Sequence, residues 1–252
     1  MSAEKTLFLV IPLFNEEENI ESLVKSIFEL RVIISSYTIH VICIDDGSSD
    51  STISMLKKYR EDSPLLIDIL SYGENRGPGY AFQYGFQYLH GKYSIDDIII
   101  TMEGDNTSKV EVIRYMINRI EFEGTDIVLA SPYAYGGGIL NTGMFRQIIS
   151  YFANTLIRIF LGVQGIHTFS SFFRAFKADA FQKLQAKYSP EIIDYEGFEC
   201  MVELLKKSID EELTITEIPM SVDTKLRKGS SKMRVFKTII GYLKLMIHLS
   251  RK

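Results

Sequence analysis

Two acidic residues follow a short apolar run near the middle of the chain. Residues 98–102 are mostly β-branched and lie between polar residues, which predicts a buried strand, and Glu103 and Asp105 come directly after it. Gly104 between them permits a tight turn, so that both carboxylates can point to one place. Paired carboxylates at the carboxyl edge of a parallel sheet are typical of a site for a hard divalent cation, which would suit a diphosphate ligand.

A turn without any ligand is the alternative interpretation of this stretch. Acidic residues often form turns after strands. Asn106, Thr107 and Ser108 are also suitable caps for a helix that begins near Lys109. The acids alone do not decide between the two interpretations, so the rest of the chain has to.

Two further acidic clusters favour the ligand site. Glu16-Glu17 follow a predicted strand over residues 7–14, and Asp45-Asp46 follow another over residues 38–44. Because the carboxyl ends of neighbouring parallel strands meet at one edge, the three clusters should converge on one crevice. Such a crevice suits a ligand rich in hydroxyls and phosphate. No G-x-G-x-x-G follows a strand and there is no Walker lysine loop, which disfavours a dinucleotide or P-loop site.

Strands and helices alternate through the first half of the chain. Apolar runs predict further strands at residues 65–70 and 126–130. A helix should follow the first strand, with Asn15 as its cap. Helical spacing predicts further helices at residues 51–59, 80–89, 110–120 and 198–206. This order predicts an α/β fold with a mostly parallel sheet, helices on both faces and ligands at the carboxyl ends of the strands.

Composition limits the class of protein. The 252 residues can bury one large core, or a core with an appended lobe, and 46% are hydrophobic and 24% charged, as in ordinary globular proteins. The net charge of −4 disfavours a general nucleic-acid binder. Cys43 and Cys200 match no metal spacing, so we expect buried free thiols in a reducing compartment. The polar amino terminus argues against a signal peptide, and no apolar run reaches the length of a membrane span, so we expect a soluble or peripheral protein.

Two long apolar segments occur in the second half, at residues 144–163 and 235–249. Basic residues interrupt both of them. Each segment is either a core or interdomain helix, or a helix that lies in a membrane interface with its basic residues towards lipid phosphates. The sequence leaves both possibilities open.

Four ordered motifs resemble those of the family 2 inverting glycosyltransferases with the GT-A fold. They are Ile11-Pro12-Leu13-Phe14-Asn15-Glu16, Ile44-Asp45-Asp46-Gly47-Ser48-Ser49-Asp50, Asn75-Arg76-Gly77 and Glu103-Gly104-Asp105. Later segments resemble the dolichol-phosphate mannose synthase branch of that family, namely Ser170-Ser171-Phe172-Phe173, Glu217-Ile218-Pro219 and Arg227-Lys228-Gly229-Ser230-Ser231-Lys232. The resemblance runs from about residue 6 to residue 232.

The resemblance implies a role for individual residues. It implies a nucleotide-sugar pocket built from Pro12, Phe14, Glu16, Asp45, Asp46, Gly77, Glu103 and Ser231. It places Glu103 and Asp105 where the family has the Asp-x-Asp pair that holds Mg²⁺ or Mn²⁺. It implies that Asp105, Arg227 and Lys232 are catalytic, the two cations on a loop that closes over the diphosphate, and that Arg146 and Ser170 bind the acceptor.

Several residues depart from the family pattern. Phe14 stands where Tyr is usual, Glu103 replaces the first Asp of the acidic pair, and Ala130-Ser131-Pro132-Tyr133 lacks an expected arginine. His167-Thr168-Phe169-Ser170 also differs from the branch, and we interpret His167 as structural. The departures leave the sugar and the acceptor open, while the donor half of the pattern is intact.

The acceptor decides whether a general base is needed. A lipid phosphate is already anionic, whereas a hydroxyl must lose a proton to a carboxylate. The candidate bases are Asp194, Glu196 and Glu199, but we prefer to interpret these acids as the capped start of the helix at 198–206.

The sequence therefore predicts a GT-A domain over residues 1–232 and a C-terminal amphipathic helix over residues 233–252. We expect an inverting hexosyltransferase that uses a UDP- or GDP-hexose, a divalent metal and a polyprenyl phosphate acceptor. We expect it in the cytoplasm, peripheral on the cytoplasmic membrane face. The alternatives are a hydroxyl-directed transferase of polysaccharide or glycan synthesis and a nucleotide-sugar-binding module without catalysis.

Overall fold

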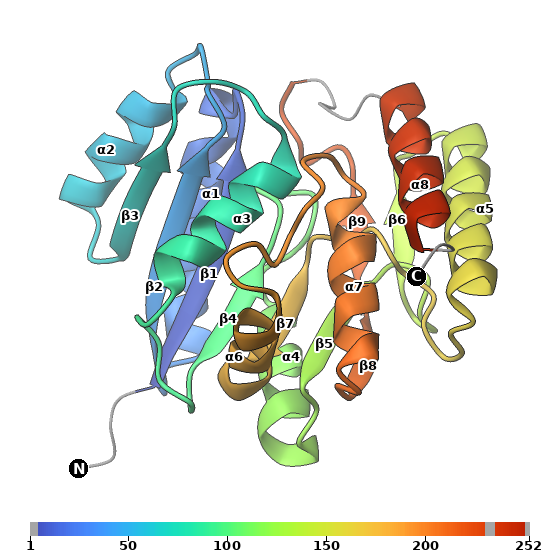
Figure 1. Cartoon of the computed structure of the whole chain (residues 1–252). Coiled ribbons are helices and arrows are strands. Elements are labelled where there is room, and N and C mark those ends of the chain that lie inside the picture. Colours follow the sequence, from blue (N-terminus) through green and yellow to red (C-terminus); the bar gives the residue numbers. More distant parts are fainter. Residues whose placement is uncertain (1–4, 230–234, 250–252) are drawn as a thin grey trace.

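A central sheet organises the computed structural model, which describes residues 5–229 and 235–249 (Figure 1). Within those residues the sheet has seven strands in the order β3-β2-β1-β4-β7-β5-β8. Their bounds are Lys5–Leu13 (β1), Tyr37–Asp45 (β2), Leu66–Ser71 (β3), Ile98–Thr101 (β4), Ile127–Ser131 (β5), Arg174–Lys177 (β7) and Ile215–Pro219 (β8). Only β7 among these runs antiparallel to its neighbours, so the predicted mostly parallel sheet is confirmed.

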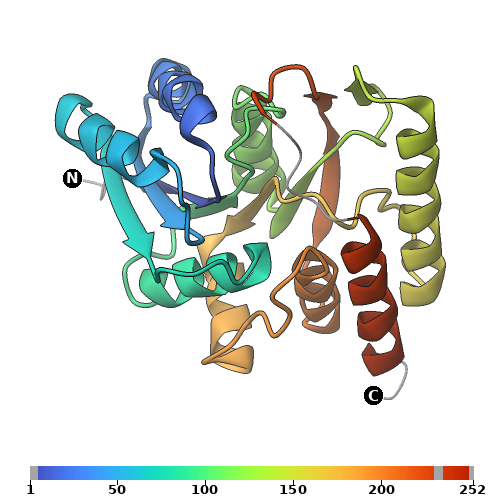
Figure 2. The same cartoon turned by 90° about the horizontal axis from the view of Figure 1, so that it is seen from above.

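The register brings the acidic clusters to one edge of the sheet. Strands β1 and β2 are paired as far as Leu13 and Asp45, and β4 follows β1 as far as the Val10–Thr101 pair. The chain after β4 continues beside the end of β1, where a Cβ added to Gly104 would lie 2.2 Å from Leu13 Cδ2. Gly104 is therefore needed for close packing against β1. Figure 2 shows the molecule from above, which is the side of the sheet at which the parallel strands end.

Helices cover both faces of the sheet, as the sequence predicts. Alternate residues of β1 face opposite layers, with Leu7 and Leu9 in one buried cluster and Phe8 and Val10 in the other. The first cluster is covered by α1 (Glu17–Ile33), α2 (Thr52–Asp62) and α4 (Val112–Glu123). The second is covered by α3 (Pro78–Leu89), α6 (Ala178–Tyr188) and α7 (Cys200–Asp210). Cys43 and Cys200 are buried free thiols, as expected.

The remaining elements lie beyond the β8 edge of the sheet (Figures 1 and 2). They are β6 (Gly138–Leu140), β9 (Ser221–Asp223), α5 (Met144–Leu161) and α8 (Val235–Leu249). Helix α8 packs closely on the residue that precedes α7, because a Cβ on Gly241 would lie 2.4 Å from Glu199 Oε2, and its Leu245 is only 1% exposed. The division into residues 1–232 and 233–252 stays a prediction. Among the described residues, no helix has both the length and the apolar character that crossing a bilayer requires.

Three predicted helix starts are wrong. Asn15 does not cap α1. It has a positive φ of 52°, and its Oδ1 accepts the backbone N–H of Ser49 at 2.8 Å, which ties the end of β1 to the turn after β2. Helix α4 begins at Val112, so residues 106–108 do not cap it. Helix α7 begins at Cys200, later than the sequence predicts, and Glu199 occupies its N-cap position without a side-chain cap hydrogen bond.

Candidate active site

Asp105 lies at the centre of a polar cluster and is 8% exposed. Its Oδ1 accepts the backbone N–H and the hydroxyl of Thr107, at 3.0 and 2.8 Å. Its Oδ2 accepts Arg227 Nε at 2.7 Å, and a second guanidinium nitrogen of Arg227 contacts the same oxygen. Asp105 thus forms the turn that the simpler sequence interpretation expects, and it also binds a cationic side chain from the far end of the chain. We call residues 103–107 the acid loop.

Glu103 has one carboxylate oxygen without a hydrogen-bond partner among the described residues. Its Oε1 accepts the backbone N–H of Phe172 at 3.4 Å, whereas its Oε2 is buried and has no hydrogen bond within the described part of the chain. Burial, and then repulsion by Asp105, raise the pKa of Glu103 to about 7. A buried acceptor without a donor costs free energy, so this oxygen is suited to a ligand that brings positive charge.

Asp45 and Asp46 are both buried at the end of β2. Asp45 accepts the hydroxyl of Ser71 at 3.1 Å and the backbone N–H of Ser48 at 3.2 Å. These contacts fix the orientation of its carboxylate at the carboxyl end of the strand.

Asp46 holds the loop that leads into α3. Its carboxylate accepts the hydroxyl of Tyr72 at 2.6 Å, Asn75 Nδ2 at 2.9 Å and the backbone N–H groups of Arg76 and Gly77 at 2.7 and 2.9 Å. Burial raises the pKa of Asp46, while the hydrogen bonds from Tyr72 and from the backbone of Arg76 and Gly77 lower it. Gly77 has φ +103°, and a Cβ there would lie 2.6 Å from the backbone oxygen of Glu196. The conformation of this loop therefore requires glycine.

Pro12, Phe14 and Glu16 complete the same edge at the end of β1. Pro12 and Phe14 are half-buried, and Glu16 is 8% exposed. Glu16 Oε2 accepts Asn19 Nδ2 at 2.6 Å. The predicted nucleotide-sugar residues Pro12, Phe14, Glu16, Asp45, Asp46, Gly77 and Glu103 thus come together at the carboxyl ends of β1, β2 and β4. Ser231 and Lys232 lie outside the described residues.

The chain that follows β9 brings Arg227 to this edge. We call residues 224–229 the basic loop. Its start is fixed because the N–H of Asp223 donates to Thr107 O at 2.9 Å and Val222 forms an isolated bridge with Ser108. Its far end lies against α1, where Lys228 bonds to Asn19 through both backbone groups. The two halves of the sequence therefore meet at Asp105.

The predicted acceptor residues lie towards α5 and α8. Ser170 shares a side-chain hydrogen bond with Tyr242 of α8. Arg146 belongs to the first turn of α5, and its side chain lies outside the described part of the structure. The predicted site therefore includes one acceptor residue whose contacts are described, Ser170, which connects the acceptor side to α8.

A buried network that the sequence analysis missed holds the loop of residues 165–173. Glu217 Oε1 accepts the N–H groups of His167 and Thr168 at 2.9 and 2.7 Å, and Asn154 Oδ1 accepts the N–H of Phe169 at 3.0 Å. Arg174, 1% exposed, donates to Phe169 O at 2.7 Å. Burial lowers the pKa of Arg174 to about 10 and raises that of Glu217. An arginine at the start of a buried strand was the signal for this network.

The three candidate bases have other contacts. Glu196 accepts Arg76 Nε at 3.1 Å, and Asp194 lies 3.0 Å from Lys207 Nζ. Glu199 packs against Gly197 and Gly241. Of the three, Glu196 is nearest to the predicted donor pocket, since its backbone oxygen accepts the N–H of Gly79 at the start of α3.

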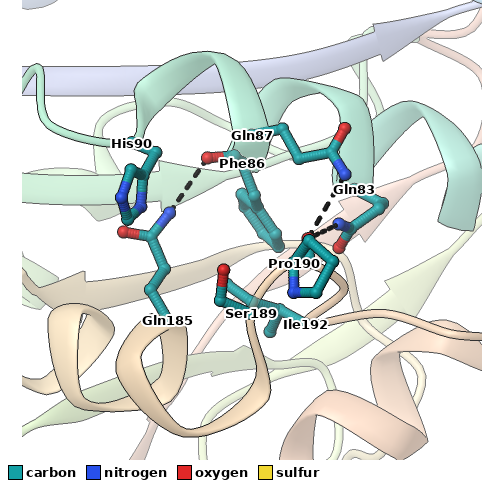
Figure 3. Close-up of a pocket in the computed structure, with 8 residues that line it drawn as sticks. All are labelled: Gln83, Phe86, Gln87, His90, Gln185, Ser189, Pro190 and Ile192. Atoms are coloured by element: carbon teal, nitrogen blue, oxygen red, sulfur yellow. Dashed lines mark hydrogen bonds between the residues drawn. The ribbon is translucent and has the colours of Figure 1, made fainter.

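A hollow of about 270 Å³ lies elsewhere, between α3 and α6 (Figure 3). Its amides are satisfied by neighbouring carbonyls. Gln83 Nε2 donates to Pro190 O at 2.7 Å and Gln185 Nε2 donates to Phe86 O at 3.0 Å. None of the acidic clusters lines this hollow, so we do not interpret it as the active site.

Comparison with known proteins identifies the family. Residues 8–185 match the model of Glycosyl transferase family 2. The chain belongs to this family. A polyprenol monophosphomannose synthase of Mycolicibacterium smegmatis is 27% identical over 231 residues, which cover 91% of this chain and 81% of that relative. A dolichyl-phosphate beta-glucosyltransferase of Saccharomyces cerevisiae is 28% identical over 85% of this chain and 66% of its own length.

A solved structure is also similar in fold. The mannosyltransferase of Pyrobaculum calidifontis, determined in complex with GDP-Man and Mn²⁺, superposes with a TM-score of 0.57 at 14% identity, covering 88% of this chain and 57% of that one. The expected GT-A fold is therefore confirmed. In this family 2 glycosyltransferase the acid loop, the Asp45–Asp46 cluster and Arg227 share one edge of that fold.

The residues at this edge fit a divalent cation. A hard cation prefers carboxylate oxygens, and the buried, unpartnered Oε2 of Glu103 is such an oxygen next to Asp105. Within the described residues no group of three or more His, Cys, Asp or Glu side chains is arranged to hold a metal. Two protein carboxylates with further oxygens from a diphosphate would therefore be the donor set.

Proposed function

We propose that this family 2 glycosyltransferase transfers a hexose, with inversion, from a nucleotide diphosphate sugar to a polyprenyl phosphate. The observation that carries the proposal is the contact of Arg227 with Asp105 beside the buried oxygen of Glu103 that has no partner in the described part of the chain. One site thus combines anionic ligands for a cation with a cationic group for a diphosphate. The similarity to a polyprenol monophosphomannose synthase and to a dolichyl-phosphate beta-glucosyltransferase supports this acceptor.

Cleavage of the donor requires that charge on the leaving diphosphate be stabilised. Glu103 and Asp105 would hold Mg²⁺ or Mn²⁺, which supplies Lewis-acid stabilisation of the diphosphate oxygens when bound. Arg227 Nε and its terminal nitrogens are hydrogen-bond donors at the same place. They can bind the diphosphate once the cation replaces Arg227 as the partner of Asp105. Lys232 is proposed as a second cationic donor from the same part of the chain.

The state of the candidate bases supports a phosphate acceptor. A phosphate oxygen attacks the anomeric carbon without losing a proton, so no general base is required. Asp194 and Glu196 are both engaged by cationic side chains, those of Lys207 and Arg76, so neither carboxylate stands ready for an incoming hydroxyl. A hydroxyl acceptor is the second candidate, and Glu196, whose side chain is 51% exposed beside α3, is the carboxylate that would serve it.

The membrane contact is proposed from the surface of α5. Ile148, Phe152 and Ile159 are 59, 62 and 70% exposed, and their spacing places them on one face of the helix. Ile240 and Leu243 of α8 are exposed as well. Side chains of this kind bind in the headgroup region of a bilayer, where a polyprenyl phosphate presents its headgroup. We therefore propose a peripheral protein at the cytoplasmic face of the membrane, with Arg146 and Ser170 towards the acceptor.

A transfer assay tests the proposal. The protein is incubated with radiolabelled UDP-glucose, UDP-galactose, GDP-mannose or UDP-galacturonate, MnCl₂ and vesicles that contain a polyprenyl phosphate, and the label that enters the organic phase is counted. Label from one of the donors is expected in the organic phase. Label released only as free sugar would favour hydrolysis or a hydroxyl acceptor, and no metal-dependent reaction with any donor would contradict the proposal.

A further inference from the structure

Asn19 is a buried polar residue on the apolar face of α1. It is 2% exposed and lies on the helix face that also carries Ile20, Leu23 and Ile27. A buried side-chain amide is costly unless both of its polar atoms have partners. At Asn19 they do, and the partners come from other segments of the chain.

The amide of Asn19 binds both backbone groups of Lys228. Asn19 Oδ1 accepts the N–H of Lys228 at 3.0 Å, and Asn19 Nδ2 donates to Lys228 O at 3.0 Å. The same Nδ2 donates to Glu16 Oε2 at 2.6 Å. Lys228 lies 209 positions away in the sequence, so this is a tertiary contact in which Asn19 pairs with the backbone as a neighbouring strand would.

Asn19 is also attached to the acid loop. Asn106 Nδ2 donates to Asn19 O at 3.0 Å, and Asn106 follows Asp105 directly. Thus the start of α1, the acid loop and the basic loop meet at one residue. Arg227, the neighbour of Lys228, has its guanidinium on Asp105.

The basic loop is therefore attached at two places, one before Arg227 and one after it. The pairing of β9 with residues 107–108 fixes its start, and Asn19 fixes its end. Asp105 alone would not keep Arg227 at the site, because a ligand bound by Asp105 competes with the guanidinium for the same carboxylate. The contact with Asn19 involves only the backbone of Lys228, so it persists when the side chain of Arg227 changes partner.

We propose that Asn19 is a positioning residue for the transfer reaction, which tethers the basic loop through Lys228 and so keeps Arg227 within reach of the donor diphosphate. The role in transfer rests on the proposed function, whereas the tether itself does not. Asn19 acts through Lys228 and Arg227, and its removal should release the loop without removing any group that contacts the donor.

Limited proteolysis tests the tether without any assay of activity. Trypsin cleaves after Lys225, Arg227 and Lys228, and mass spectrometry distinguishes these cuts from all others. Because cleavage of a native protein follows the opening of its loops, loss of two hydrogen bonds in Asn19→Ala should speed these cuts about tenfold or more. Asn19→Gln keeps both the donor and the acceptor but displaces them by one methylene group, so an intermediate increase is expected, and this variant serves if Asn19→Ala does not fold.

Asn154→Ala is the matched control for proteolysis. Asn154 is likewise a buried helical asparagine, 5% exposed, whose Oδ1 accepts a backbone N–H from a distant loop, at Phe169. Its replacement should leave cleavage at Lys225, Arg227 and Lys228 within about twofold of the wild type, since it does not contact that loop. Equal acceleration in Asn19→Ala and Asn154→Ala, or none in Asn19→Ala and Asn19→Gln, would overturn the tether.

A double-mutant cycle tests the role in transfer. A small misplacement of a positioning group can cost about 100-fold in rate, so Asn19→Ala should lower kcat on that scale while the KM for the donor changes far less. In the Arg227→Ala background, Asn19→Ala should lower kcat by less than about threefold, because the group that Asn19 positions is already missing. An equal loss in both backgrounds would show that Asn19 acts through Glu16 or stability instead. If the wild type transfers no sugar, the proposed function fails. The same four proteins are then compared by their affinity for UDP and GDP in the presence of Mn²⁺.

Discussion

Arg227 donates from Nε to Oδ2 of Asp105 at 2.7 Å, although the two residues lie 122 positions apart. The pair joins the loop after β4 to the loop after β9. Its side chains are 22% and 11% exposed, so the pair is largely shielded from water, and removal of one partner would leave the other charge uncompensated. The same carboxylate is a proposed cation ligand, and a cation and Arg227 therefore compete for it.

Replacement of Arg227 should separate cation binding from transfer. In Arg227→Ala the carboxylate of Asp105 loses its cationic partner, so Mn²⁺ alone should bind more tightly than to the wild type. Transfer should nevertheless fall by about 100- to 1,000-fold, the usual cost of removing a group that stabilises the charge of a transition state. Calorimetry with MnCl₂ and the transfer assay measure the two effects.

Lys225→Ala is the control for this prediction. Lys225 belongs to the same loop, its side chain is exposed, and its backbone N–H bonds to Asp223. Its loss should change Mn²⁺ affinity and transfer by less than about threefold, as for a surface substitution. Weaker Mn²⁺ binding in Arg227→Ala would contradict the competition between the guanidinium and the cation.

Glu103 should make the cation-free protein less stable as the pH rises. Its pKa is raised from 4.5 to about 7 by burial and by Asp105, so between these pH values the folded state binds more protons than the unfolded state. The free energy of unfolding therefore falls with increasing pH in this window, by at most about 3 kcal/mol from this group. Glu103→Gln does not titrate and should gain stability relative to the wild type as the pH goes from 4.5 to 8. Urea unfolding in EDTA measures the difference, and a pH-independent difference would refute the assignment.

Gly79 should not tolerate a side chain. A Cβ at this position would lie 1.9 Å from the backbone oxygen of Tyr195, and the N–H of Gly79 already bonds to Glu196 O at 2.8 Å. We expect Gly79→Ala to lower the free energy of unfolding by about 1–3 kcal/mol, as overpacking does, and to displace the start of α3. Gly143→Ala is the matched control, because nothing lies within 4 Å of its Cβ position, and urea unfolding compares the two. Equal stability of both variants would contradict the close contact.

The exposed face of α5 should govern membrane binding. The double variant Ile148→Glu/Ile159→Glu should reduce co-sedimentation with anionic liposomes by about tenfold or more, since each apolar side chain taken from the interface costs about 1.5 kcal/mol or more. Phe122→Glu is the control, because Phe122 is 81% exposed on α4, which covers the other side of the molecule. Equal binding of the two variants would contradict the proposed contact.

The layered architecture could be predicted from the sequence because its signals are local. The apolar runs of β1, β2 and β4 and the helical spacing in α1 mark buried elements without knowledge of their neighbours. Strand β7 carries no such signal, since Arg174–Lys177 begins and ends with a basic residue. Its place between β4 and β5 depends on the burial of Arg174 among the carbonyls of residues 169–171, which is a tertiary relationship.

The candidate site also contains residues that the sequence could predict and contacts that it could not. The acids at the strand ends could be predicted because strand order places them, and Arg227 was predicted from a motif. The contact of Asn19 with Lys228 joins residues 209 positions apart, and an asparagine on the apolar face of α1 was the only local sign of it. Likewise, Asp46 was predicted as a ligand of the donor, and its carboxylate holds the turn at residues 75–77 through three donors and also accepts the hydroxyl of Tyr72.

Calorimetric titration of UDP and of GDP in the presence of MnCl₂, with the wild type and Asp105→Ala, tests the central claim most directly. Asp97→Asn is the control, because Asp97 is also buried and accepts the backbone N–H groups of Thr6 and Ser94, far from the proposed donor pocket. We predict that one nucleotide binds tightly to the wild type and to Asp97→Asn, that EDTA abolishes this binding, and that Asp105→Ala lacks it. Nucleotide binding that is indifferent to both EDTA and Asp105 would contradict the account of the donor site.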